Sequence, residues 1–316
     1  MRRLVFFLAV LLGFAVAAVH AQTSSKIWRL GVLSPVDFEL IRGLVLPELA
    51  RNGFVEGRNL VVDVRVGVGE QLPELARLVV AAKPDAIIAV SDWAVQPARK
   101  ATSTVPIIMS PIGQDPVSIG IVASWARPGG NVTGVALLVP ELDGKRVGLL
   151  QETIPAAHRI AVLTTHETPN DEIRAAAARA GLELIELSVT GPNEYEGSFE
   201  AMRTAGAQAL MIVGTPELAN DAEALASIAL RAGLPTICAS RVAAERGCLV
   251  GYGPNLPELY RRVATYVVRI FRGADPGELP IEGPTHIELV LNLKTAHALG
   301  VSLPEPLIAR ADEVIE

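Results

Sequence analysis

The chain has 316 residues, half of them hydrophobic, with a formal net charge of −6 and a sequence pI near 5.5. This length exceeds one typical hydrophobic core and suits two domains of about 120 to 150 residues each. The acidic balance and the scattered basic residues exclude an extended nucleic-acid surface, because such a surface needs clustered positive charge to neutralise phosphates.

The first 21 residues are typical of a secretory signal peptide. Arg2 and Arg3 precede an apolar run from Leu4 to Val19, and Ala21 is the small residue expected at the cleavage point. A transmembrane anchor is the alternative, but the run is short for a membrane span. No cysteine follows the run, which excludes a lipid anchor of the lipoprotein type. We expect export to the periplasm.

From Trp28 onward, short apolar strands alternate with amphipathic helices. The uninterrupted apolar run Asp85–Val90 is typical of a parallel strand that is covered on both faces. Expected strands are 28–34, 59–66, 85–90, 105–110 and 132–139, and expected helices are 38–52, 72–82, 94–102, 117–126 and 141–153. Because no hairpin signal interrupts this alternation, it predicts an α/β fold with a doubly wound parallel sheet.

The stretch 127–150 is interpreted as the crossing from this lobe into a second, similar lobe. Expected strands there are 159–165, 182–189, 209–215, 236–240, 249–252 and 287–293, and expected helices are 170–180, 194–205, 218–232, 256–273, 294–299 and 305–316. We expect the first lobe to comprise 22–138 plus the returning segment 254–284. The second lobe would comprise 139–253, and 285–316 would lie at the hinge.

Two cysteines, Cys238 and Cys248, remain after the signal peptide. An oxidising compartment permits a disulfide between them. Their positions, one within a predicted strand and one just before the next strand, favour two small buried side chains instead. Neither has a histidine at metal-ligand spacing, so we expect no zinc site.

Ligands of parallel α/β sheets bind outside the carboxyl ends of the strands. We therefore predict a cleft between the lobes with ligand-binding residues from the strand-end loops: Ser34, Ser91, Asp92, Trp93, Asp115, Leu137, His166, Thr215, Arg241 and Tyr252.

Six of these candidates have a structural alternative. Asp92 and Asp115 could cap the helices that follow them, bind the ligand, or act as a catalytic pair. Trp93 and Tyr252 offer either an apolar face to a planar ligand or ordinary packing between lobes. His166 is either a ligand contact or a solvated loop residue, and Arg241 either clamps a ligand carboxylate or lies free on the surface. Gly134 and its neighbours serve tight backbone geometry.

Enzyme motifs are missing from the sequence. It has no Gly-x-Ser-x-Gly elbow, phosphate-binding loop, dinucleotide-binding turn or His-Glu-x-x-His helix. We therefore expect no cofactor and no catalytic residue. An α/β enzyme acting in the same cleft stays an alternative function, as does a sensor that presents its ligand-bound form to a membrane receptor.

Several segments together resemble the substrate-binding proteins of ABC transporters, in the group that includes tryptophan-binding and other aromatic-solute-binding members. They are Gly53-Phe-Val-Glu-Gly-Arg-Asn59, Leu72-Pro-Glu-Leu-Ala76, Ala101-Thr-Ser-Thr-Val-Pro-Ile107, Asp115-Pro-Val117, Ala126-Arg-Pro-Gly-Gly-Asn-Val-Thr-Gly134, Leu142-Asp-Gly-Lys-Arg146, Tyr252-Gly-Pro-Asn255, Leu291-Asn-Leu-Lys-Thr-Ala296 and Ala311-Asp-Glu-Val-Ile315.

The resemblance implies a type I periplasmic-binding fold, with two α/β lobes joined by a three-strand hinge. It implies a monomer that closes on an amino-acid-like or carboxylated aromatic solute and delivers it to an inner-membrane ABC permease. One segment departs from the family. Ser91-Asp92-Trp93 stands where the family has a Gly-Thr/Ser-Pro-like turn, which puts the usual ligand in doubt at that wall.

Overall fold

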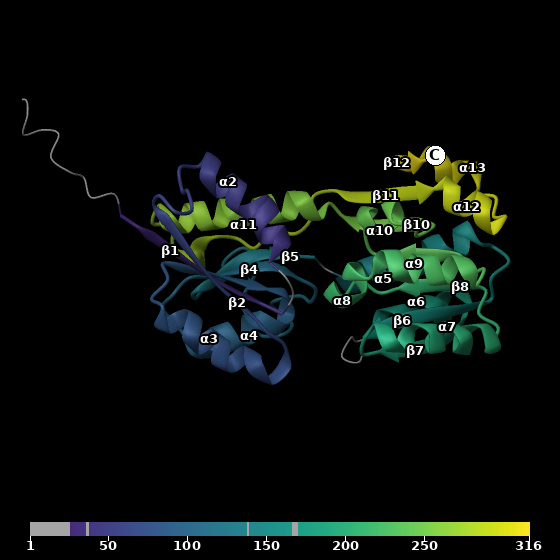
Figure 1. The fold of residues 1–316 in the computed structure, drawn as a ribbon, viewed down its shortest axis with the longest axis horizontal. Helices are drawn as coiled ribbons and strands as arrows, with labels where there is room; N and C mark the ends of the chain where they lie inside the picture. The colour runs from purple at the N-terminus through teal and green to yellow at the C-terminus, as the bar shows by residue number, and fades with distance from the viewer. Residues whose placement is uncertain (1–25, 36–37, 138, 166–169) are drawn as a thin grey trace, which may run out of the picture.

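A computed structural model describes residues 26–35, 38–137, 139–165 and 170–316. The predicted signal peptide lies outside these ranges. Two separate β-sheets with their helices lie side by side along the long axis of the molecule (Figure 1). The predicted fold class, an α/β fold with two lobes, is therefore confirmed. Within the described ranges, none of the helices combines the length and apolar character of a membrane span.

The first sheet is entirely parallel and has the strand order β2-β1-β3-β4-β5. Its strands are β1 (Trp28–Ser34), β2 (Leu60–Val66), β3 (Ala86–Val90), β4 (Ile107–Ile112) and β5 (Val132–Ala136). In β3 all five residues are buried, as the apolar run at this position predicts.

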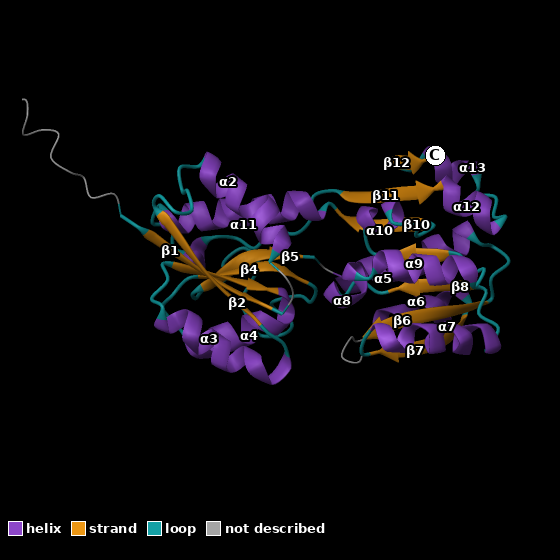
Figure 2. Cartoon of the chain, in the orientation of Figure 1, coloured by secondary structure: helices purple, strands orange, loops and turns teal. Residues whose placement is uncertain are grey.

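Helices cover both faces of this sheet (Figure 2). A π-helical turn (Ile41–Val45), α2 (Leu46–Arg51) and α11 (Leu256–Phe271) pack on one face, against residues such as Leu30 and Ile88. On the other face α3 (Leu72–Ala81) and α4 (Ser91–Ala101) pack against Leu33 and Ile87. The alternation of side chains along each strand thus supplies two cores to one lobe.

The second sheet has the order β12-β11-β10-β9-β8-β6-β7. Its strands are β6 (Arg159–Thr165), β7 (Glu183–Val189), β8 (Ala209–Ile212), β9 (Thr236–Cys238), β10 (Val250–Pro254), β11 (Ile287–Asn292) and β12 (Glu313–Ile315). All neighbouring pairs are parallel except β10 and β11, which are antiparallel. This single antiparallel pair departs from the parallel sheet expected in the second lobe.

The helices of the second lobe also divide between two cores. They are α5 (Val139–Thr153), α6 (Asp171–Ala180), α7 (Tyr195–Thr204), α8 (Pro216–Asn220), α9 (Ala222–Arg231), α10 (Arg241–Glu245), α12 (Leu293–Leu299) and α13 (Glu305–Ala309). Short 3₁₀ turns occupy Gly69–Gln71, Pro192–Glu194 and Pro276–Glu278.

The chain passes between the two sheets three times. It leaves β5 for α5, leaves β10 for α11, and returns along residues 280–286 into β11. Near the first crossing Gly134 has φ +132°, and a Cβ there would lie 2.4 Å from the Met109 carbonyl oxygen. Only glycine fits so close to β4, which confirms the tight backbone geometry expected at this residue.

Two helix predictions are wrong, one near the carboxyl terminus and one in the second lobe. The expected helix 305–316 ends at Ala309, and its last residues form β12 beside β11, because Val314 and Ile315 suit a strand. The segment 285–316, expected at the hinge, lies at the edge of the second sheet. The expected single helix 218–232 is divided between α8 and α9 at Asp221, which accepts a hydrogen bond from the Tyr195 hydroxyl.

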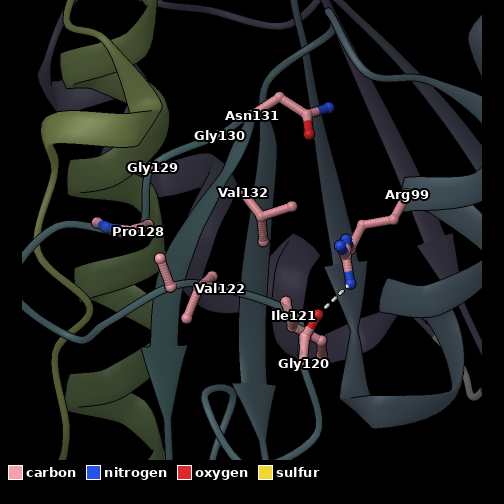
Figure 3. A pocket seen from close by; sticks show the side chains of 10 residues that line it. Arg99, Gly120, Ile121, Val122, Pro128, Gly129, Gly130, Asn131 and Val132 are labelled. Atoms are coloured by element: carbon pink, nitrogen blue, oxygen red, sulfur yellow. Dashed lines mark hydrogen bonds between the residues drawn. The ribbon is translucent and has the colours of Figure 1, made fainter.

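The expected helix 117–126 is also wrong: this segment forms a series of turns. Gly120 adopts φ +68°, which ends a right-handed helical path. The Arg99 guanidinium donates a hydrogen bond of 2.8 Å to the Gly120 carbonyl (Figure 3). Side chains of Ile121 and Val122 are buried, so the apolar pattern here marks packing of a loop against the first lobe.

Cys238 and Cys248 form a disulfide with an S–S distance of 2.04 Å. The preference for two separate buried cysteines was therefore wrong. The helix α10 forms the crossover between the parallel strands β9 and β10, and this crossover brings together the two cysteines, which are ten positions apart in the sequence. Both cysteines belong to the second lobe's core.

Replacing both cysteines by serine (C238S/C248S) should lower the free energy of unfolding by about 2 to 3 kcal/mol, because the open loop regains entropy in the unfolded state. Urea denaturation of the two proteins measures this difference. Reductant should shift the wild-type midpoint towards that of the variant and leave the variant unchanged. Equal midpoints for oxidised wild type and variant would contradict the prediction.

Candidate ligand-binding cleft

A cavity of about 410 Å³ lies between the lobes. We call it the main cleft cavity. Its volume suits a small organic molecule. It is lined by residues of both lobes: Ser91, Asp92, Trp93, Gln96, Pro111, Gly113, Gln114, Ile119 and Leu137 from the first, and Val139, Asp143, Thr165, Val213, Gly214, Thr215 and Glu217 from the second. Five of the ten predicted site residues are among them: Ser91, Asp92, Trp93, Leu137 and Thr215.

Ser91 begins α4 with φ +64°, a left-handed conformation that non-glycine residues rarely adopt. Such a conformation costs on the order of 1 kcal/mol and is held only by its surroundings. The residue is 8% exposed, and its buried hydroxyl has no hydrogen-bond partner within the described protein. An unsatisfied buried hydroxyl on a cavity wall indicates a group that a ligand would complete.

Asp92 follows in the first turn of α4. Its carboxylate accepts hydrogen bonds from the backbone N–H groups of Gly113 at 2.9 Å and Gln114 at 3.2 Å. It therefore does not cap its own helix, as one alternative expected, but joins α4 to the loop after β4. This arrangement fixes the first-lobe wall of the cavity.

Trp93 from the first lobe and Thr215 from the second both line the main cleft cavity. Trp93 keeps 42% of its surface exposed, which is high for tryptophan in a packed interface. Thr215 is the N-cap of α8, and its hydroxyl accepts a hydrogen bond from the Leu218 N–H at 3.4 Å. The cavity thus has one flat apolar surface and one polar helix start.

A second cleft cavity of about 230 Å³ adjoins the first, since both include Trp93, Thr165 and Glu217. Its remaining walls are Pro35, Val68, Gly69, Leu72, Val189 and Thr190. The cleft between the lobes therefore extends beyond the main cavity towards the ends of β1, β2 and β7. By contrast, the cavity of about 350 Å³ around Arg99 and Gly130 lies within the first lobe alone (Figure 3).

Asp115 does not line either cleft cavity. Its carboxylate accepts hydrogen bonds from the backbone N–H groups of Val117 and Ser118 and from Trp125 Nε1 at 2.8 Å. Burial alone would raise the pKa of Asp115, but these three donors hold it below its ordinary value. The structure places Asp115 as the anchor of the turn segment that replaces the expected helix.

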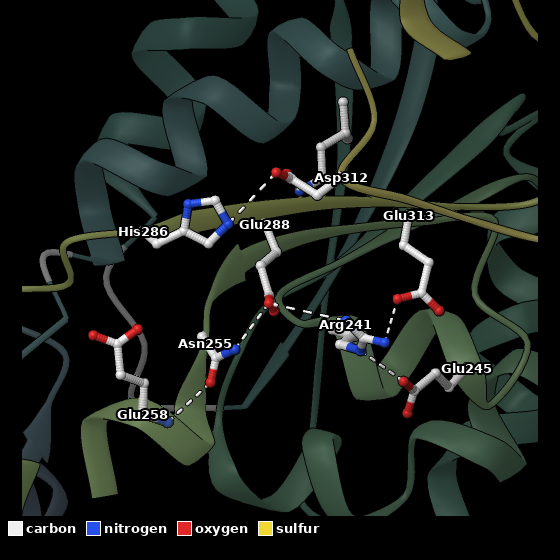
Figure 4. A network of polar contacts seen from close by, with 9 residues as sticks. Arg241, Glu245, Asn255, Glu258, His286, Glu288, Asp312 and Glu313 are labelled. Atoms are coloured by element: carbon white, nitrogen blue, oxygen red, sulfur yellow. Dashed lines mark hydrogen bonds and ion pairs between the residues drawn. The ribbon is translucent and has the colours of Figure 1, made fainter. Parts of the chain in front are cut away.

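Arg241 lies on α10 within an acidic network (Figure 4). Its guanidinium pairs with Glu245 at 2.8 Å and with Glu313, and lies 4.0 Å from Glu288. Glu288 also accepts a hydrogen bond from Asn255, the N-cap of α11. Arg241 is therefore already paired and lines neither cleft cavity, which argues against the carboxylate clamp expected from the sequence.

The remaining predicted residues lie elsewhere. Ser34 is buried at the end of β1, next to but not among the residues that line the second cleft cavity. Tyr252 is half-buried in β10 and packs against the second lobe's core. His166 lies outside the described residues.

The sequence reading missed an ion pair at the back of the cleft. Asp143, which lines the main cleft cavity, and Arg146 are both almost fully buried on α5 and lie 2.5 Å apart. Arg146 also donates to the carbonyls of Tyr252 at 2.8 Å and Ala239 at 3.5 Å. Burial raises the pKa of the Asp143 carboxyl, and the Arg146 charge opposes this rise. The pair joins α5 to the ends of β9 and β10.

Replacing Asp143 by alanine should destabilise the second lobe by about 3 to 5 kcal/mol, because it leaves a buried guanidinium without a counter-charge. Asp171→Ala is a matched control. Asp171 forms the same i,i+3 pair with Arg174 at 3.0 Å, but 89% of its side chain is exposed. Its loss should cost below about 1 kcal/mol. Equal destabilisation in urea titrations of the two variants would contradict the role of burial.

In the described part of the chain, no three His, Cys, Asp or Glu side chains gather as metal ligands. The geometry is that of a two-walled binding cleft. Polar groups at the starts of α4 and α8 and an apolar surface at Trp93 meet there.

Comparison with known proteins agrees with this geometry. A tyrosine-binding protein of Clostridioides difficile (strain R20291) is 25% identical over 261 residues, which are 80% of this chain and 74% of that protein. A conserved domain protein of Vibrio cholerae O1 biovar El Tor has a solved structure with a TM-score of 0.83 and 26% identity, covering 92% of this chain and 100% of that one.

A further solved structure, the ABC domain from Streptococcus pneumonia in complex with L-Trp, has a TM-score of 0.81 and 25% identity over 92% of this chain and 100% of that one. The family model described as ABC transporter substrate binding protein matches residues 36–315. The match spans both lobes and the cleft. The chain therefore belongs to the family of ABC transporter substrate-binding proteins, a family of binding proteins and not of enzymes.

Proposed function

We propose that the protein is the extracytoplasmic receptor of an ABC importer. After export and removal of residues 1–21, it captures a small organic solute between the lobes and delivers it unchanged to an inner-membrane permease. The lobes are proposed as 22–138 with 254–284 and as 139–253, and the protein is proposed to act as a monomer. The three crossings between the sheets serve as the hinge.

The main cleft cavity is the observation that carries this proposal. Its walls come from both lobes, so a solute in it contacts α4 on one side and α8 on the other. A ligand shifts a conformational equilibrium only by its difference in affinity for the two states. A solute that touches both walls gains contacts on closure and therefore favours the closed form.

The ligand class proposed is an amino-acid-like or carboxylated aromatic solute. Two similar proteins support an aromatic amino acid, since one is named for tyrosine and the other was solved with L-Trp. The exposed face of Trp93 supports a planar group, because aromatic rings stack on such a surface. Ser91, Asp92, Leu137 and Thr215 complete the proposed contacts.

A screen of amino acids, aromatic amines and aromatic acids tests the proposal. A true ligand at 100 times its dissociation constant should stabilise the folded protein by about 2.7 kcal/mol, which raises the unfolding temperature by several degrees. Differential scanning fluorimetry measures this shift. If no compound at millimolar concentration raises the unfolding temperature, the protein is not a receptor for this class of solute.

Replacing Trp93 by alanine should weaken binding of the best compound from that screen about tenfold to a hundredfold, because the planar surface is lost. The unfolding temperature of the unliganded protein should change little, since the side chain is partly exposed. Leu230→Ala is a suitable control, because Leu230 on α9 is 41% exposed and lies outside both cleft cavities. Equal affinities of the Trp93 variant and wild type in calorimetric titration would remove Trp93 from the site.

A further inference from the structure

Among the described residues that line the two cleft cavities, the charged side chains are all acidic. Asp92, Asp143 and Glu217 line the main cleft cavity, and Glu217 also lines the second. No lysine, arginine or histidine is among the described residues that line either cavity. A receptor for an anion needs positive charge or free N–H donors at its site. The cleft as described offers the opposite charge.

Only one of the three carboxylates is neutralised. Asp143 forms its ion pair with the buried Arg146. Asp92 accepts hydrogen bonds from backbone N–H groups, and Glu217 forms no ion pair with any residue in the described ranges. Two carboxylates without an ion-pair partner in the described ranges therefore line one cavity, Asp92 from the first lobe and Glu217 from the second.

The Asp92 carboxylate also occupies backbone N–H donors that a ligand carboxylate would otherwise use. The N–H groups of Gly113 and Gln114, which line the cavity, are bonded to the Asp92 side chain. The positive end of the α4 dipole is compensated by the same carboxylate in its first turn. The buried Ser91 hydroxyl, unpartnered within the described protein, remains as a neutral donor or acceptor.

Resting on the proposed function, we propose that the ligand carries a cationic group, such as an ammonium, that lies between Asp92 and Glu217. The aromatic part packs on Trp93, and Ser91 supplies a neutral hydrogen bond. An aromatic acid without a cationic nitrogen is disfavoured by like-charge repulsion. Of the two ligand classes expected from the sequence, this selects the amine-bearing one and rejects the simple carboxylated aromatic.

The same charges would couple ligand binding to closure. Closing the empty cleft brings the two carboxylates nearer to each other and away from water, which disfavours the closed form. A cation between them reverses the sign of this interaction. The cationic ligand therefore favours closure by contact and by charge, whereas a neutral ligand does so by contact alone.

Calorimetric titration with matched pairs of compounds tests the assignment. The probes are tryptamine and indole-3-acetate, tyramine and 4-hydroxyphenylacetate, with tryptophan and tyrosine as the zwitterions. We expect each amine to bind at least about tenfold more tightly than its matched acid and at least as tightly as its amino acid, and its affinity to fall as salt is added. Acids that bind as tightly as the amines overturn the assignment and leave the receptor function intact. Failure of every compound, whatever its charge, overturns both.

Charge-removing variants test whether the cationic group of the ligand lies between Asp92 and Glu217. Glu217→Gln keeps the shape of the side chain and should weaken binding of the tighter amine about tenfold, whereas the acids should bind more tightly than to wild type, because a repelling charge is removed. Asp92→Asn should act in the same direction. Glu223→Gln, on the exposed surface of α9, is the matched control and should leave affinity unchanged. Wild-type affinity for both amines in Glu217→Gln and in Asp92→Asn contradicts the proposed position of the cation.

Discussion

The structure depends on a division of the hydrophobic core. Each sheet buries its own two faces, and none of the core clusters in the described residues takes its strands from both sheets. Each lobe therefore gains its stability from its own packing. The surfaces that face each other across the cleft are free to carry polar and charged groups, because no large apolar area must be covered there. Three short crossings are then sufficient to hold the lobes together and still permit them to move.

Polar interactions at the cleft have two different tasks in this molecule. The Asp143–Arg146 pair is buried, and Arg146 donates hydrogen bonds to carbonyls at the ends of β9 and β10. The pair therefore fixes the second-lobe wall of the cleft. Asp92 does the corresponding work in the first lobe by joining α4 to the loop after β4. These contacts hold both walls in place without a ligand, which lowers the free-energy cost of ordering the site when a ligand binds. Glu217 and Trp93 are the exposed groups that remain to meet a ligand.

Most strands and helices and the division into two lobes could be predicted from the sequence, because strands and helices each impose their own spacing on the buried apolar residues. Two strands, β1 and β6, have the predicted bounds, and the crossing after β5 was identified from its glycines and Pro140. The loop 117–126 was mistaken for a helix because buried apolar residues in a turn segment imitate helical spacing. The disulfide depends on the path of the crossover through α10, and the antiparallel pairing joins β10 to β11, which α11 separates in the sequence. The spacing of apolar residues reports neither. Arg241 shows the same limit for the site: a strand-end position suggested a ligand clamp, whereas Glu245, Glu288 and Glu313 approach it only in the folded chain.

The most direct test of the hinged receptor is small-angle X-ray scattering of the purified protein, recorded without ligand and with each compound that stabilises it against thermal unfolding. A hinged clamp predicts a smaller radius of gyration and a shorter maximum dimension in the presence of such a compound, at unchanged molecular mass. Identical scattering curves with and without every stabilising compound would contradict the account, because they would show that the two lobes do not close on a solute.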